Sequence, residues 1–365
     1  MKSFCSLPKS GIATLVAATL ALAACQHQPE KTAAPTPTVA AKPVNLQVVT
    51  QREVGDGLYE MAYSPVADAL YVASAQSFKN VNGGVIYRLN PVTLATEGET
   101  HTDLKNFGMV ADNAGAVFYT SNSLDGTISK VDARSGKVLQ RLNLGGKKDK
   151  DGDLPGAREL LLQGHNLYVS RVADPGFISI VDTRTFKLAG TIQHAGKWVT
   201  GLLYSPSMGV VYAANGDGEI LVINPRTHKI EHRWTAGDGN KYLFLNMAED
   251  PATGRLLVTD NSQGKTTLVF DEHTGRVIKR IPGDALGIKF NAQRNEIYIS
   301  QRETKKVLQL DATTYAVKHS WSFDTNPNSL LVSPDGNTLY VTLKQPFNQD
   351  NSTPGKDSVV RIALK

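Results

Sequence analysis

The sequence predicts an all-β protein, a seven-bladed β-propeller that an N-terminal strand closes within the last blade. The first observation is a strand motif, clearest in Leu339-Tyr340-Val341-Thr342, that occurs seven times. Its marker residue, tyrosine in six copies and leucine in one, stands at positions 71, 119, 168, 212, 257, 298 and 340. This spacing is typical of propeller blades. The second observation is that the last copy lacks a fourth strand, which residues 46–51 can supply from ahead of the first copy.

Each copy has the parts of a four-stranded blade. A tight turn such as Ser333-Pro334-Asp335-Gly336 comes first, where proline fixes φ and glycine accepts a positive φ. The motif strand follows with alternating faces, and a third strand ends in an Asp or Asn that bonds its own turn. A fourth alternating strand completes the sheet. The turn column, which we interpret as structural, is Asn90, Asp132, Asp182, Asn224, Asp271 and Asp311.

The N-terminus has the pattern of an export signal. Lys2 and Lys9 form a positive region, and residues 11–24 are small or apolar over a length too short for a permanent transmembrane helix. Leu22-Ala23-Ala24-Cys25 resembles a bacterial lipobox, which predicts a lipoprotein signal peptide over residues 1–24 and lipidation of Cys25. Gln26 favours the outer membrane. We expect export and a lipid anchor on the periplasmic side, and a soluble periplasmic protein cut nearby is the alternative.

The remaining chain divides into a tether and one domain. Residues 25–45 are rich in Pro, Ala and Thr and poor in large apolar side chains, so we expect a disordered linker. Residues 46–365 are predicted to form a single propeller, and we expect a monomer. The net charge of +5 is too small to indicate a nucleic-acid-binding protein by itself. Both cysteines, Cys5 and Cys25, precede the domain, which excludes a disulfide and a cysteine metal site within it.

Several segments resemble the YncE family of bacterial envelope propellers, within the wider group of YVTN-repeat proteins. The resemblance is carried by residues 57–64, 83–94, 103–108, 158–160, 326–330 and 360–364. It extends over almost all of residues 46–365. It implies an exported seven-bladed propeller without an established catalytic activity, with single-stranded DNA binding as a property of the family. The lipobox and the tether depart from the plain cleaved signal of that family.

The seven copies differ in sequence where each innermost strand begins, and we place the candidate site there. In a propeller these positions meet round the central channel on one face. They read Tyr59-Glu60, Phe107-Gly108, Arg158-Glu159, Thr200-Gly201, Leu245-Asn246, Leu286-Gly287 and Asn328-Ser329, with Trp198, Tyr242 and Phe244 just upstream. Packing alone predicts a repetitive column, whereas this one mixes carboxylates, an arginine, amides and aromatic rings. Hydrogen bonds between blades are the alternative explanation.

The loops between the second and third strands emerge on the same face and are rich in basic residues. They contribute Lys79, Asn122, Arg171, Asn215, Asn261, Lys265, Arg302, Lys305, Lys306 and Lys344. Together with the aromatic residues they predict a platform for single-stranded DNA, on which cations hold phosphates and rings stack bases. Scattered surface lysines explain the cations equally well. The predicted ligand-binding residues are Tyr59, Glu60, Phe107, Arg158, Glu159, Trp198, Phe244, Asn246, Asn328, Arg171, Arg302 and Lys344.

Signals of catalysis are weak. The sequence contains no G-x-S-x-G elbow, phosphate-binding loop or H-E-x-x-H zinc pair. His228 and His232 fall on a predicted strand, about 13 Å apart, and residues 149–153 match only the start of a calcium loop. We expect no cofactor, no metal and no catalytic residue. The alternatives of other classes are a propeller hydrolase or lactonase using Glu60, Arg158 and Glu159, and a scaffold for an envelope protein partner.

Overall fold

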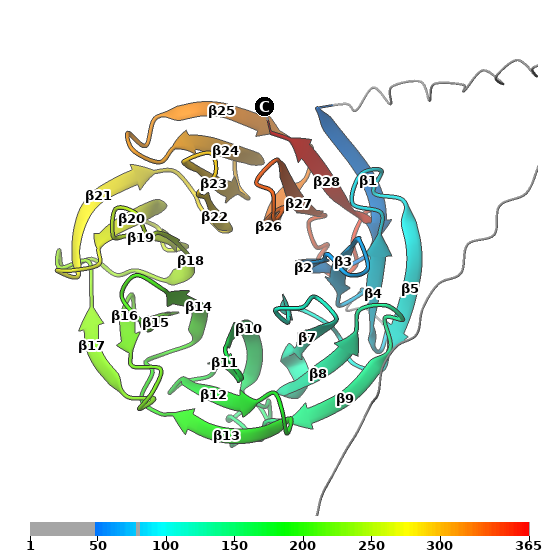
Figure 1. The fold of residues 1–365 in the computed structure, drawn as a ribbon, viewed down its shortest axis with the longest axis horizontal. Coiled ribbons are helices and arrows are strands. Elements are labelled where there is room, and N and C mark those ends of the chain that lie inside the picture. Colours follow the sequence, from blue (N-terminus) through cyan, green and yellow to red (C-terminus); the bar gives the residue numbers. More distant parts are fainter. Residues whose placement is uncertain (1–47, 78–80, 365) are drawn as a thin grey trace, which may run out of the picture. The chain divides into compact units, whose positions relative to one another are not determined.

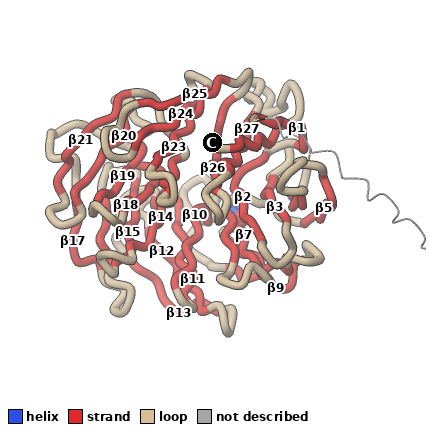
Figure 2. Tube along the Cα trace, turned by 45° about the horizontal axis from the view of Figure 1, so that its top comes forward, coloured by secondary structure: helices blue, strands red, loops and turns tan. Residues whose placement is uncertain are grey.

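Seven four-stranded antiparallel sheets lie radially round a central axis in the computed structural model of the protein (Figure 1). The structure describes residues 48–77 and 81–364. Strands make up nearly all of their regular structure, and the short 3-10 turn η1 (Ser123–Asp125) interrupts blade 2 (Figure 2). The predicted seven-bladed propeller is therefore confirmed. The predicted signal peptide, Cys25 and the linker lie outside the described residues.

Within blades 1 to 6 the strands run from the centre outward in chain order. The bounds for blades 1 to 3 are β2 (Leu58–Ser64), β3 (Ala69–Ser74), β4 (Gly84–Leu89), β5 (Thr96–Thr102); β6 (Met109–Ala111), β7 (Val117–Asn122), β8 (Thr127–Asp132), β9 (Val138–Asn143); and β10 (Gly156–Gln163), β11 (Asn166–Val172), β12 (Phe177–Asp182), β13 (Lys187–Ile192). Those for blades 4 to 6 are β14 (Val199–Ser205), β15 (Val210–Asn215), β16 (Ile220–Ile223), β17 (Ile230–Trp234); β18 (Phe244–Asp250), β19 (Arg255–Asp260), β20 (Thr266–Asp271), β21 (Arg276–Pro282); and β22 (Ile288–Asn291), β23 (Glu296–Gln301), β24 (Lys306–Asp311), β25 (Val317–Ser322).

The seventh blade joins the two ends of the domain. Its inner three strands are β26 (Asn326–Val332), β27 (Thr338–Lys344) and β28 (Asp357–Ala363), and its outer strand is β1 (Val49–Gly55) from the start of the domain. β1 pairs antiparallel with β28, with Val49 opposite Ile362 and Glu53 opposite Ser358. The predicted closure by an N-terminal strand is therefore confirmed. The strand lies a few residues later in the sequence than the segment 46–51.

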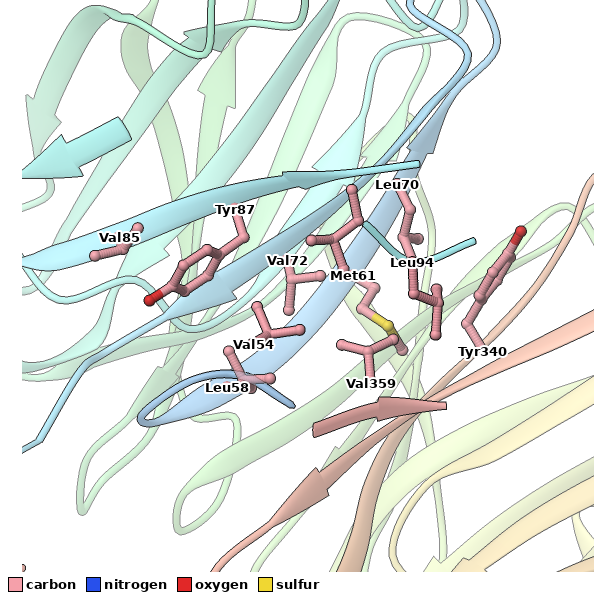
Figure 3. Packing of buried hydrophobic residues seen from close by; sticks show 11 residues of the cluster. Val54, Leu58, Met61, Leu70, Val72, Val85, Tyr87, Leu94, Tyr340 and Val359 are labelled. Carbon is pink, nitrogen blue, oxygen red and sulfur yellow. The ribbon is translucent and has the colours of Figure 1, made fainter. Parts of the chain in front are cut away.

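The hydrophobic core is divided into clusters that lie between neighbouring blades. In the cluster of Figure 3, Leu58, Met61 and Val72 from blade 1 pack against Tyr340 and Val359 from blade 7. The other clusters likewise combine residues from adjacent blades. Burying one such side chain contributes about 1.5 to 3 kcal/mol, and a blade buries its faces only against its neighbours. We therefore expect the ring to unfold as a unit.

The repeated motif is explained by contacts between blades. Its tyrosine is buried, and in three blades its hydroxyl donates to a backbone carbonyl in the outer turn of the next blade. These pairs are Tyr71 with Ala133, Tyr168 with Pro225 and Tyr340 with Pro91. The predicted turn bonds are also present, since every member of the Asp or Asn column accepts a backbone N–H from two or three residues ahead. Gly336, at φ +69°, donates to the Ser333 carbonyl within its turn.

Candidate functional site

A cavity of about 550 Å³ lies among the innermost strands of the ring. Residues from all seven blades line it, including at least one from each pair predicted at the start of an innermost strand. Its size is that of a small-molecule site. Of the predicted ligand-binding residues, those that line it are Tyr59, Glu60, Phe107, Arg158, Glu159, Asn246, Asn328, Arg302 and Lys344.

β-Bulges turn these side chains toward the centre. The register between the first and second strands shifts at Tyr59-Glu60, Arg158-Glu159, Thr200, Leu245-Asn246 and Asn328-Ser329. In blades 2 and 6 the corresponding residues come just before the strand begins. A bulge re-aims a side chain and ends regular pairing, and such features are frequent beside active sites. The residues at the start of the innermost strands, which we call the variable column, are therefore the part of each blade whose side chains can differ from copy to copy.

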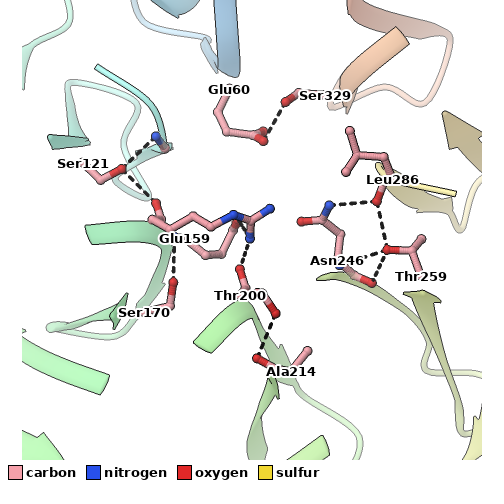
Figure 4. A network of polar contacts seen from close by, with 12 residues as sticks. Glu60, Ser121, Glu159, Ser170, Thr200, Ala214, Asn246, Thr259, Leu286 and Ser329 are labelled. Atoms are coloured by element: carbon pink, nitrogen blue, oxygen red, sulfur yellow. Dashed lines mark hydrogen bonds and ion pairs between the residues drawn. The ribbon is translucent and has the colours of Figure 1, made fainter. Parts of the chain in front are cut away.

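A hydroxyl on the motif strand holds the backbone of this region in five blades. Each stands two residues after the marker residue, and its oxygen accepts the backbone N–H of a residue at the cavity wall. The pairs are Ser121 with Gly108, Ser170 with Glu159, Thr259 with Asn246, Ser300 with Gly287 and Thr342 with Ser329, at 2.8 to 3.0 Å. Ser121, Thr259 and Ser300 also donate to a carbonyl of the following blade, and Figure 4 shows two of these links. The repeated motif therefore builds the wall of the site.

Two aromatic rings form one side of the cavity. Tyr59 and Phe107 have ring centroids 4.6 Å apart and planes inclined at 49°. Lys344 holds this side, because its ammonium nitrogen lies 3.9 Å from the Tyr59 centroid and donates to the Leu58 carbonyl at 2.8 Å. The same nitrogen is 3.4 Å from the carboxylate of Asp357. Burial lowers the pKa of Lys344 to about 8. Lys344 thus joins blade 7 to blade 1 under the tyrosine.

The centre of the site brings together groups of both charges. Four basic side chains, Arg158, Lys289, Arg302 and Lys344, line the cavity with the carboxylates of Glu60 and Glu159. Arg158 donates to the Thr200 carbonyl of blade 4 and lies 4.0 Å from Glu159. Burial, and next the charge of Glu60, raise the pKa of Glu159 to about 7, while Arg158 and Lys289 oppose the shift. Glu159 therefore changes charge near neutral pH.

The other polar side chains present hydrogen-bond acceptors to the cavity. The Ser329 hydroxyl of blade 7 donates to the Glu60 carboxylate of blade 1 at 2.6 Å, which fixes that carboxylate at the cavity wall. The amide nitrogen of Asn246 donates to the Leu286 carbonyl at 2.8 Å, so its amide oxygen points toward the centre (Figure 4). The site can thus both accept hydrogen bonds and bind anionic groups.

Three predicted ligand-binding residues lie away from this cavity. Phe244 is fully buried in the core between blades 4 and 5. Arg171 is also fully buried, because its guanidinium donates to the carbonyls of Gly145 and Pro155 and holds the loop between blades 2 and 3. Burial lowers the pKa of Arg171 to about 10. Trp198 is 40% exposed on a neighbouring loop.

Few of the predicted loop cations reach the cavity. Arg302 stands exposed at its rim, and Lys344 lies inside. Lys265 pairs with Glu303, and Lys305 donates to the Asp324 carbonyl at 2.9 Å. Lys79 lies outside the described residues. The basic character of the site therefore comes from a few inward-facing groups rather than from the whole rim.

Sequence reasoning missed two features of the site. Lys289 is the second residue of β22 and lines the cavity. It lies two residues after Gly287, the last residue of the predicted column in that blade. The supporting hydroxyls were visible as a column of Ser121, Ser170, Thr259, Ser300 and Thr342 but belonged to a motif interpreted as purely architectural. Across residues 48–77 and 81–364, no three His, Cys, Asp or Glu side chains form a group suited to a metal ion.

Similarity to known proteins agrees with this architecture. The chain is 37% identical over 319 residues to the protein named "Uncharacterized protein YncE" of Salmonella typhimurium and 36% identical to its namesake in Escherichia coli. Each alignment covers 86% of this chain and 90% of the relative. The chain belongs to the YncE family.

The resemblance to the YncE family seen in the sequence is thereby confirmed. Three of the segments that carried it, residues 57–64, 158–160 and 326–330, lie on innermost strands and contain cavity residues. A more distant relative, "Antigen Lp49" of Leptospira interrogans, is 26% identical over 70% of this chain and 58% of its own length. No family model matches the chain. No helix in the described ranges is long and apolar enough to cross a membrane.

Proposed function

We propose that the protein binds single-stranded DNA at the central cavity without a catalytic step. The observation that carries this proposal is the aromatic pair of Tyr59 and Phe107 at the edge of a cavity lined by four basic side chains. Aromatic rings stack unpaired bases, and Lys and Arg bind the phosphates that follow. Both kinds of group line the same small cavity.

The shape of the site favours one inserted nucleotide. A volume of about 550 Å³ accepts a small molecule, so a base and its sugar enter while the rest of the strand stays outside. Asn246 and Glu60 supply acceptors for N–H groups on base edges, such as the N3–H of an unpaired thymine. Arg302 at the exposed rim is placed to meet a phosphate of the next nucleotide.

We also propose that the protein acts on the periplasmic side of the envelope, held at the outer membrane by a lipid on Cys25. This proposal rests on the export pattern of residues 1–24 and on Gln26 after the cysteine. Replacing Cys25 with Ser tests it: the parent should fractionate with membranes and carry acyl groups in a mass spectrum of its N-terminal peptide. A parent that is soluble and unacylated contradicts the anchor.

A hydrolase or lactonase is the second candidate. It is favoured by the pKa of about 7 at Glu159, which suits general acid–base catalysis, beside Glu60 and Arg158 in the same cavity. Turnover of a lactone that is lost in Glu159→Gln would support this candidate. Absence of turnover in the parent over a panel of lactones and esters would reject it for those substrates.

The DNA proposal is tested by fluorescence anisotropy with a labelled oligothymidylate. Phe107→Ala and Arg158→Ala should each weaken binding, the first by roughly tenfold through lost stacking. Arg158→Ala should also lower the slope of log K against log salt by about one, as expected for one phosphate contact. Arg134→Ala, at an exposed turn between β8 and β9, is the matched control. An affinity that is unchanged in both cavity variants and does not depend on the salt concentration would reject the proposal.

A further inference from the structure

Trp198 is presented to solvent by a loop that is tightly held. Its side chain is 40% exposed and its backbone has φ +51°, a left-handed conformation that costs non-glycine residues about 1 to 2 kcal/mol. The Trp198 N–H donates to the Ala173 carbonyl at 2.8 Å, and the Lys197 N–H donates to Asp217 at 2.7 Å. Strain of this kind persists only where the surroundings impose it, and it is concentrated at functional sites.

The indole of Trp198 and the Cβ and backbone of Tyr242 flank a glycine loop between β15 and β16. A Cβ at Gly216 would come within 3.3 Å of the Trp198 ring, and a Cβ at Gly218 would come within 2.8 Å of Tyr242. The loop therefore passes between the two aromatic residues. Both precede innermost strands, Trp198 before β14 and Tyr242 before β18, so they lie at the same end of the blades as the central cavity.

Basic groups accompany both rings. The Lys197 ammonium nitrogen lies 4.2 Å from the centroid of the Trp198 ring. Tyr242 is at the edge of a shallow groove of about 780 Å³, which Lys241 and Arg280 also line. Arg280 and the Tyr242 hydroxyl share the carboxylate of Asp238, at 2.8 and 2.7 Å. This combination of exposed ring and nearby cation resembles the central cavity in chemistry while lying outside it.

The spacing suits a strand that leaves the cavity. Trp198 is three residues before Gly201, which lines the cavity, so the two positions are at most about 10 Å apart along the chain. A stacked strand advances about 3.4 Å per nucleotide, and roughly three nucleotides therefore bridge them. A base arriving at Trp198 displaces the flexible Lys197 from the ring, and its ammonium group then meets the adjacent phosphate.

We propose that Trp198, with Lys197, forms a second stacking site for the single-stranded DNA that enters the central cavity, and that the strand continues toward the groove beside Tyr242. This inference rests on the proposed DNA binding. It predicts a length dependence, because an oligonucleotide too short to leave the cavity cannot reach Trp198.

Competition binding with oligothymidylates of two and about eight nucleotides tests the second site. Trp198→Gly tolerates the left-handed backbone, and it should weaken the longer probe about tenfold while leaving the shorter one unchanged. Trp198→Phe should restore most of the affinity for the longer probe. Trp321→Phe, on the outer strand β25, is the control.

The possible failures are distinguishable. If the parent binds neither probe, the proposed function itself fails. If Phe107→Ala weakens both probes and Trp198→Gly weakens neither, DNA binding stands and the second site is wrong. An equal loss for both probes in Trp198→Gly would place its effect in the cavity wall and would also overturn the second site.

Discussion

Glu159 offers a prediction that joins the stability of the ring to the chemistry of its centre. Replacing it with glutamine keeps the shape of the side chain and removes the charge that forms as the carboxyl ionises. Burial and the neighbouring Glu60 raise its pKa to about 7 from its ordinary value of 4.5. The folded protein therefore prefers the neutral form, and this preference gives stability below the unfolded pKa that is lost as the pH rises through about 7.

The size of the effect follows from the shift. A shift from 4.5 to about 7 corresponds to at most about 3 kcal/mol. The side chain is 28% exposed and Arg158 lies 4.0 Å away, so we expect roughly 1 to 2 kcal/mol. In a domain of this size, 1 kcal/mol moves the melting temperature by about 2 °C or slightly more. Glu159→Gln should therefore melt a few degrees higher than the parent at about pH 8.5 and close to it at about pH 5.

The assay is thermal unfolding of parent and variant across this pH range, followed by DNA binding under the same conditions. An ionised Glu159 repels phosphate, so the parent should bind oligothymidylate more weakly at about pH 7.5 than at about pH 5.5, and Glu159→Gln should lose most of that dependence. Binding is compared below pH 8 because the pKa of Lys344 is about 8. Glu53→Gln, on the exposed face of β1, is the matched control. Equal melting temperatures for Glu159→Gln and the parent at high pH would refute the raised pKa and the reasoning built on it.

Three further predictions concern the scaffold. Lys344→Met should lower the melting temperature strongly, by the equivalent of about 3 kcal/mol, because it leaves the buried carboxylate of Asp357 without its cation; a melt like that of the parent would contradict the inter-blade role. Deleting residues 26–54 should lower the melting temperature of the whole domain in one transition, whereas an unchanged melt would contradict closure by β1. Thr259→Val should cost about 1 to 3 kcal/mol by leaving the Asn246 N–H without its acceptor, as urea unfolding would show, and no loss would argue against the hydroxyl support.

The fold was predictable because the sequence motif of one blade is repeated seven times. Nearly every blade repeats the tight turn, the strand with alternating faces and the Asp or Asn that bonds the next turn. Each of these signals is weak alone, but their recurrence at a nearly constant spacing predicts a propeller. The closing strand was also predictable, since the last copy lacked an outer strand. Its position was shifted because Arg52, Glu53 and Gly55 continue the pairing with β28 beyond the expected end.

The position of the central cavity was predictable from the sequence, but only some of the residues that line it were. The variable column identified the cavity wall, because residues that do not repeat are not needed for packing. Arg171 and Phe244 were misplaced because their burial depends on loops and neighbouring blades that periodicity does not describe. Lys289 was missed because it lies on β22 itself, whereas the predicted column in blade 6 ends at Gly287, just before that strand. The pKa of Glu159 required knowing that Glu60, on another blade, lies nearby.

A crystal structure of the protein with a bound oligothymidylate tests the central claim most directly. We predict density for one base in the central cavity, against the rings of Tyr59 and Phe107, with its phosphate toward Arg302. Density for the strand only at other surfaces, or an empty cavity in crystals grown with saturating oligonucleotide, would contradict the account.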